Sequence, residues 1–101
     1  MVFNIEKEPK YEKSIKYIIR NGFHNILNKV QQIEETLENG SWLQKDVKNQ
    51  YKIERLYDNQ GNLWKCKYIH NWRLVFRVVD NTIRLIDLDR RDSIYTNFLI
   101  L

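Results

Sequence analysis

The amino-acid sequence predicts an α+β domain in which an N-terminal strand and a helical hairpin pack on a four-stranded antiparallel meander sheet. Apolar residues recur at helical spacing in the first 40 residues and alternate with polar residues after residue 50. Short turn sequences separate the alternating segments, and connections this short join only antiparallel neighbours. The 101 residues suit a single domain, which we expect to span residues 1–101.

The first half of the chain predicts one short strand and two helices. Residues 2–5 form an apolar stretch that we interpret as an edge strand. Pro9 is favoured in the first turn of a helix, and the pair Asn21-Gly22 ends that helix. A second helix is expected at residues 23–38, where the apolar side chains form one stripe and a second Asn-Gly pair follows. The apolar stripes of both helices require a sheet to cover them.

The second half predicts the sheet. Its alternating segments are bounded by turn-forming residues such as Asn, Asp and Gly. The tail at 93–101 is expected to form a short strand or a helix. The four strands are expected at 51–57, 63–69, 72–79 and 82–88, with turns at 58–62, 70–71 and 80–81.

Composition excludes several classes of protein. Three glycines and one proline are too few for a disordered or collagen-like chain. No apolar run approaches the ~18 residues that a membrane span requires, and the N-terminus lacks a secretory signal, so no membrane association is expected. Cys66 is the only cysteine and cannot form an internal disulfide, which favours the reducing cytoplasm.

Positive charge is concentrated in one segment. The formal net charge is +4, and residues 63–77 contain four basic residues, four aromatic residues and no acidic residue. Basic side chains neutralise phosphates and aromatic rings stack on bases, so this composition suits a polyanion such as RNA. A half-buried sheet with a solvated basic face would have the same composition.

Strand alternation predicts that these cations share one face of the sheet, because residues i and i+2 point to the same side. The large apolar side chains of the same strands then face the helices. We therefore expect an open, concave, cationic face with no acidic residue to neutralise it. This face would carry Lys65, Lys67, Arg73 and Arg77, with Arg90 or Arg91 at its edge.

Such a face suits the cleavage of RNA. Attack by a 2′-hydroxyl group requires proton removal, in-line positioning and stabilisation of a dianionic phosphorane. Clustered lysine and arginine side chains supply the stabilisation directly. Their field also lowers the pKa of a lysine or a tyrosine among them, so that either group could take part in proton transfer.

Three segments, WKCKY (64–68), WRLVFRVVD (72–80) and RRDSIY (90–95), resemble the RelE/ParE toxin superfamily. They are most similar to its RelE-like branch, the ribosome-dependent mRNA interferases of type II toxin–antitoxin systems. The resemblance implies a toxin that cleaves mRNA in the ribosomal A site without a metal or other cofactor. It also implies that a cognate antitoxin protein holds the toxin inactive.

The resemblance assigns roles to individual residues. Lys65 and Lys67 would contact the RNA backbone and assist proton transfer, and Arg73 would stabilise the transition state. Either arginine of the RRDSIY segment, 90 or 91, fills the next position of the motif. Tyr95 would stack on a base, and its part in proton transfer stays open.

Other interpretations remain. Arg77 could either contact the substrate or be a surface charge. Glu54 could either be a surface charge or act as a catalytic base. His24 and His70 could act as acid and base, but nothing in the sequence brings them together. The fold would also suit a non-enzymatic protein, either a ParE-like gyrase inhibitor, an RNA-binding protein or a degenerate toxin. Four residues with inward parity are expected in the core: Trp64, Cys66, Trp72 and Phe76.

Overall fold

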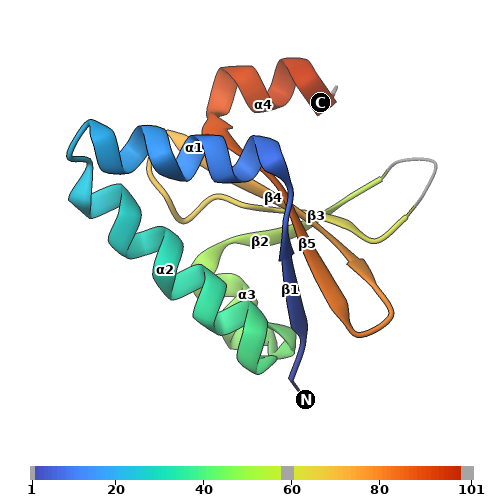
Figure 1. Cartoon of the computed structure of the whole chain (residues 1–101). Coiled ribbons are helices and arrows are strands. Elements are labelled where there is room, and N and C mark those ends of the chain that lie inside the picture. The colour runs from blue at the N-terminus through green and yellow to red at the C-terminus, as the bar shows by residue number, and fades with distance from the viewer. Residues whose placement is uncertain (1, 58–60, 99–101) are drawn as a thin grey trace.

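The computed structural model describes residues 2–57 and 61–98. In this part of the chain, five strands form one sheet in the order β1-β5-β4-β3-β2 (Figure 1). The strands are β1 (Asn4–Lys7), β2 (Ile53–Leu56), β3 (Leu63–Cys66), β4 (Trp72–Val79) and β5 (Thr82–Arg90), and the helices are α1 (Pro9–Arg20), α2 (His24–Asn39), the 3-10 turn η1 (Ser41–Leu43), α3 (Lys45–Tyr51) and α4 (Arg91–Phe98).

The predicted α+β class and the antiparallel meander are confirmed, since β2, β3, β4 and β5 pair antiparallel in sequence order. The N-terminal strand adds a detail, because β1 pairs with β5 in parallel, with Ile5 beside Ile83. The sheet is therefore mixed and has five strands. Phe3, which precedes β1, is buried against Trp42 with ring centroids 5.9 Å apart, and this contact anchors the edge strand.

The helix ends follow the predicted signals. Helix α1 begins at Pro9, and at its end the backbone N–H of Asn21 donates to the Tyr17 carbonyl and that of Gly22 to the Ile19 carbonyl. Helix α2 ends where Gly40 adopts a left-handed conformation with φ of 81°. Glycine carries no penalty there, because it has no Cβ. No helix in the described ranges is long and apolar enough to cross a membrane.

Several element boundaries differ from the predicted ones. Helix α3 occupies a segment for which the sequence predicted no element, so β2 begins at Ile53 instead of residue 51. Lys52 adopts a left-handed conformation with φ of 52° between them. Strand β3 ends at Cys66, β5 continues to Arg90, and the first part of the tail forms α4. Residues 58–60 and 99–101 of the predicted turn and tail lie outside the described residues.

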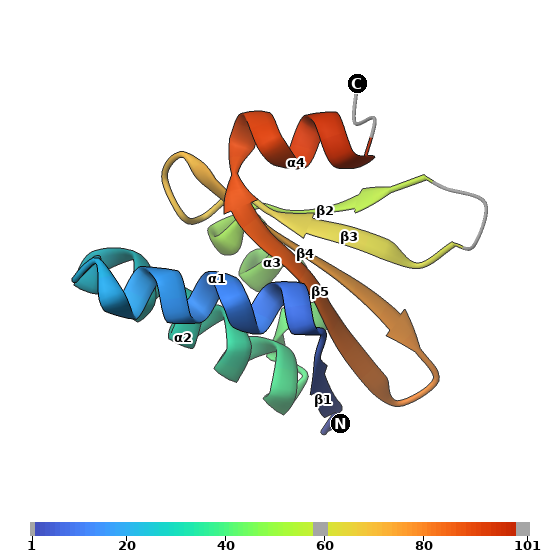
Figure 2. The same cartoon turned by 45° about the horizontal axis from the view of Figure 1, so that its top comes forward.

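Two apolar clusters lie on opposite faces of the sheet. The larger cluster lies between the sheet and α1, α2 and α3, while α4 covers a smaller cluster on the other face (Figure 2). The expected core positions are confirmed: Cys66, Trp72 and Phe76 are buried, and Trp64 is half-buried against them. Burial raises the pKa of the Cys66 thiol to about 12, so this thiol is a small apolar side chain at neutral pH.

Strand β5 does not keep the simple alternation that we expected. Val75 pairs with Asp87 and Phe76 with Leu85, so the register skips Ile86. This irregularity shifts the following residues to the opposite face, and Leu88 joins Leu85 in the large core cluster. Simple alternation along 82–88 would instead have placed residues 85 and 88 on opposite faces.

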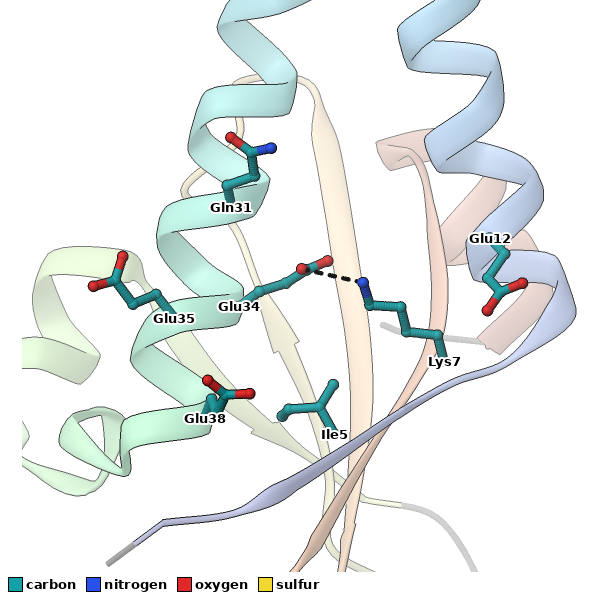
Figure 3. A pocket seen from close by; sticks show the side chains of 7 residues that line it. All are labelled: Ile5, Lys7, Glu12, Gln31, Glu34, Glu35 and Glu38. Atoms are coloured by element: carbon teal, nitrogen blue, oxygen red, sulfur yellow. Dashed lines mark ion pairs between the residues drawn. The ribbon is translucent and has the colours of Figure 1, made fainter.

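A buried polar network joins β1, α1 and α2. Tyr11 is fully buried, and its hydroxyl donates a hydrogen bond to the Glu34 carboxylate. Lys7 Nζ lies 3.5 Å from the other oxygen of the same carboxylate (Figure 3). Burial and the neighbouring Glu34 charge raise the pKa of Tyr11, so its hydroxyl stays protonated and remains a donor.

Replacement of Tyr11 by phenylalanine is expected to lower the free energy of unfolding by about 1.5–3 kcal/mol, the usual contribution of a hydrogen bond to a charged group. Urea unfolding followed by circular dichroism measures this change. Tyr17→Phe is the matched control, because the Tyr17 hydroxyl makes no hydrogen bond within the described ranges. Equal stabilities of the two variants would show that the network contributes nothing.

Candidate active site

The predicted cations meet on the face of the sheet that α4 covers, but they do not form an open surface. Lys65 and Arg73 are only 7% and 9% exposed. Ile94 of α4 is fully buried against Val75 on this face. The expectation of an open face is therefore wrong, because the tail folds as a helix over it.

Tyr95 lies at the centre of the cations. Lys65 Nζ is 5.1 Å from the centre of its ring, and the guanidinium carbon of Arg91 is 5.2 Å from it. A hydrogen bond from Arg91 lowers the pKa of Tyr95 to about 8, and Arg73 and the Lys65 charge act in the same direction against a smaller effect of burial. The structure thus places a readily ionised phenol among three cations.

The structure distinguishes between the two consecutive arginines. Arg91, the first residue of α4, reaches Tyr95. Arg90 is the last residue of β5 and pairs with Trp72, and its side chain lines a separate pocket beside α1. Of the two arginines, only Arg91 lies with Tyr95, because the chain passes from β5 into α4 between Arg90 and Arg91.

An acidic residue lies among the cations, contrary to the expectation of a face without one. Glu54 on β2 pairs in register with Lys65 on β3. Its carboxylate oxygens lie 3.0 Å from Lys67 Nζ and 3.7 Å from Lys65 Nζ. Glu54 is about half exposed and Lys67 about one-third exposed, so this pair is the accessible part of the site. Pairing across the β2–β3 hairpin was the signal that could have placed Glu54 here.

Two hydrogen bonds hold the Arg73 guanidinium group, and one of its N–H donors has no partner among the described residues. Its Nη1 atom donates to the carbonyl oxygens of His70 and Trp72, both at 2.8 Å. Its Nε atom has no hydrogen-bond partner in the part of the chain that is described. A buried donor without an acceptor is costly, and an anion at this place would satisfy it.

The remaining predicted residues lie elsewhere. Arg77 donates a hydrogen bond to the carbonyl oxygen of Gly61 in the β2–β3 connection. His24 and His70 line one pocket with Phe23 and Ile26, so the expectation that nothing brings the two histidines together is wrong. Residues 2–57 and 61–98 contain no group of three or more His, Cys, Asp or Glu side chains that could hold a metal ion.

The assembled groups match the needs of phosphodiester cleavage. Lys65, Lys67, Arg73 and Arg91 provide positive charge where a phosphorane would develop. The Tyr95 phenol, with its lowered pKa, can exchange a proton near neutral pH, and the Glu54 carboxylate lies beside the lysines. The site therefore holds a cationic cluster together with a phenol and a carboxylate.

The mixed sheet with helices on both faces is a fold that this chain shares with solved toxin structures, each less than 25% identical to it. YafQ from the E. coli DinJ–YafQ toxin–antitoxin complex matches with a TM-score of 0.77 and 18% identity, over 94% of this chain and 99% of the matched chain. The YoeB dimer from Staphylococcus aureus matches with a TM-score of 0.70 and 22% identity, over 88% of this chain and 97% of the matched chain. The metal-bound toxin from Helicobacter pylori matches with a TM-score of 0.71 and 23% identity, over 92% of this chain and 98% of the matched chain. No family model matches the sequence, and no curated protein matches it significantly.

The pKa of Tyr95 gives a direct test of this geometry. We expect half of the Tyr95 phenol to be ionised at about pH 8. Arg91→Met removes the hydrogen bond that contributes most, so the pKa should return toward the ordinary value of about 10. Tyrosinate absorbance measured against pH, with the curve of Tyr95→Phe subtracted, isolates this group. An unchanged titration in Arg91→Met would show that Arg91 does not contact the phenol in solution.

Proposed function

We propose that the protein is a ribosome-dependent endoribonuclease, the toxin component of a type II toxin–antitoxin system. The observation that carries the proposal is the placement of Tyr95 among Lys65, Arg73 and Arg91, with Lys67 and Glu54 at the accessible edge. Such an arrangement would stabilise negative charge and supply groups for proton transfer. The fold shared with the YafQ and YoeB toxins supports the assignment.

The proposed reaction is attack of a 2′-hydroxyl on the adjacent phosphate. Lys67, at the accessible edge, would contact the phosphate oxygens, and the nearly buried Arg73 would add positive charge behind it. Either the Glu54 carboxylate or the Tyr95 phenolate would accept the proton of the 2′-hydroxyl. The bond from phosphorus to the 5′-oxygen would break as the new bond forms, and the leaving 5′-oxygen would take up a proton from the Tyr95 phenol or from solvent. The expected products carry a 2′,3′-cyclic phosphate and a 5′-hydroxyl.

The proposed setting is the ribosomal A site, and the ribosome would supply the orientation that the protein alone lacks. Lys65 and Arg73 are almost fully buried, so the message must be held against a narrow accessible edge. A requirement for in-line positioning then explains a dependence on the ribosome. Such a protein would act in the cytoplasm.

An antitoxin is the second proposed partner. YafQ and YoeB were each crystallised in toxin–antitoxin complexes, with DinJ and YefM respectively. The net charge of +4 and the cationic site favour a partner with an acidic segment. Co-expression with an acidic antitoxin should relieve the growth arrest that the protein causes alone.

Cleavage on ribosomes tests the function directly. The purified protein is mixed with ribosomes programmed with a defined message, and the new RNA ends are mapped by primer extension. We expect ends within the A-site codon, and only weak cleavage of the same message without ribosomes. Equal cleavage of the free message, or no cleavage in either case, would contradict the proposal.

A further inference from the structure

A second group of cationic and aromatic side chains lies behind the candidate active site. It forms a pocket between α1 and the neighbouring ends of β4 and β5. Nothing in the proposed reaction uses this pocket, although Arg90 belongs to a segment that the sequence analysis had singled out. Its lining includes Lys10, Lys13, Tyr17, Trp72, Asp89 and Arg90.

The pocket and the active site lie on opposite faces of the sheet, at the same ends of β4 and β5. Trp72 and Arg90 are register partners on β4 and β5, and both line the pocket. The next residues along the chain, Arg73 and Arg91, both reach Tyr95 in the active site. The two sites therefore share the same two strand ends, and an extended polymer could pass around this end of the sheet from one site to the other.

The side chains of the pocket suit a nucleotide. Tyr17 is 41% exposed and lies beside Trp72 with ring centroids 6.5 Å apart, which provides an aromatic surface for a base. Lys13 and Arg90 are exposed and make no ion pair within the described residues, so both are available to a phosphate.

The remaining charges leave this pocket cationic. Lys10 Nζ forms an ion pair with Asp87 Oδ2 at 2.9 Å. The one carboxylate in the lining, Asp89, already accepts the backbone N–H of Arg90 through Oδ1. An incoming phosphate would therefore meet two unpaired cations and a single carboxylate.

The opposite side of α1 is negatively charged. There, the pocket between β1, α1 and α2 is lined by four glutamates and a single lysine, Lys7, which Figure 3 shows pointing toward Glu34. An RNA strand is repelled from that side and attracted to the side of Lys13 and Arg90. The charge distribution of α1 thus favours one path for RNA across the molecule.

We propose that the pocket beside α1 binds one nucleotide of a single-stranded RNA near the nucleotide held at the active site. The base would stack on Tyr17, and the phosphate would contact Lys13 and Arg90. This inference rests on the proposed function, since it extends the RNA path beyond the cleaved bond. It concerns affinity for RNA and does not concern the chemical step.

Binding of an RNA that cannot be cleaved tests the pocket separately from the reaction. The probe is a fluorescein-labelled 2′-O-methyl RNA decamer of mixed sequence, and its fluorescence anisotropy is measured over a range of salt concentrations. Lys13→Ala combined with Arg90→Ala should weaken binding at least tenfold and reduce the slope of log K against log salt by about 0.7 for each cation removed. Tyr17→Ala should weaken binding by about tenfold with little change in slope.

Two control variants lie on the same helix outside the pocket. Lys16→Ala removes one positive charge, half of what the double variant removes, and Ile19→Ala removes an exposed apolar side chain; both should bind the decamer almost as the parent does. Thermal unfolding verifies that each variant is folded.

Three results would overturn the inference. The first is parent-like binding by the Lys13/Arg90 double variant, and the second is no binding of the decamer by the parent. The third is a pocket-dependent preference for an oligoglutamate peptide over the decamer. If the parent still cleaves messages on ribosomes in any of these cases, the inference fails while the proposed function stands.

Discussion

Replacement of Lys67 by alanine is expected to slow cleavage on programmed ribosomes by about 100- to 1000-fold, the usual effect of removing one donor that stabilises a developing oxyanion. The Lys67 side chain is about one-third exposed, and its ammonium group contacts Glu54 at the accessible edge of the site. Its removal leaves no cavity in the core, so the variant should stay folded. The measurement is the single-turnover cleavage rate, with circular dichroism to verify the fold.

The control for Lys67→Ala is Arg84→Ala, which removes the same charge from another part of the sheet. Arg84 Nε on β5 lies 3.2 Å from Glu6 Oε2 and 3.9 Å from Glu8 Oε1. Its replacement should leave the cleavage rate within a few-fold of the parent rate, because exposed ion pairs contribute little. If Lys67→Ala cleaves as fast as Arg84→Ala, the cationic face is not the reaction site.

Arg73→Ala is a less informative variant than Lys67→Ala. The sequence predicts Arg73 on an open face. The structure shows instead that its guanidinium group is buried and donates to the carbonyl oxygens of His70 and Trp72. Alanine at this position would leave both carbonyls without that donor, so a loss of activity would mix catalysis with folding.

Replacement of Ile94 by alanine is expected to lower the free energy of unfolding by about 2–5 kcal/mol, as for other fully buried aliphatic side chains. Ile94 is the buried contact between α4 and the sheet, where it packs against Leu63 and Val75. Small domains have only about 5–15 kcal/mol of total stability, so this loss is a large part of it. Urea unfolding measures the change.

The same substitution should disturb Tyr95, which follows Ile94 on α4. Loosening of this helix moves the phenol away from Arg91 and Arg73, so the pKa of Tyr95 should rise from about 8 toward its ordinary value. Thr96→Ala is the matched control, because Thr96 is exposed on α4 and, among the described residues, its side chain bonds only to the Asp92 carbonyl of the same helix. Equal stability and equal Tyr95 titration in both variants would mean that α4 does not hold the site together.

Local signals in the sequence were sufficient for most of the fold. Pro9 and the Asn-Gly pairs predicted the helix ends, because their effects depend only on neighbouring residues. The strand at 72–79 was predicted with its observed bounds. Helix α3 was missed because none of its residues is fully buried, so its apolar pattern is weak.

The site was predicted in part, because its geometry depends on contacts between distant segments. The grouping of Lys65 with Arg73 follows from alternation within neighbouring strands, and the structure confirms that both lie at the α4 face. The approach of Glu54 depends on hairpin register, and the burial of Arg73 depends on the tail folding as a helix. Neither feature has a local signature. The irregularity at Ile86 also arises only when β5 pairs with β4.

The central claim, that this face cleaves RNA through a 2′-hydroxyl, is tested most directly by removing that hydroxyl. A message with a single 2′-deoxynucleotide at the mapped cleavage position is placed on programmed ribosomes and compared with the unmodified message. We predict that the unmodified message is cut to a fragment ending in a 2′,3′-cyclic phosphate, and that the deoxy message is not cut at that position. Cleavage of the deoxy message at the same position and rate would contradict the proposed mechanism.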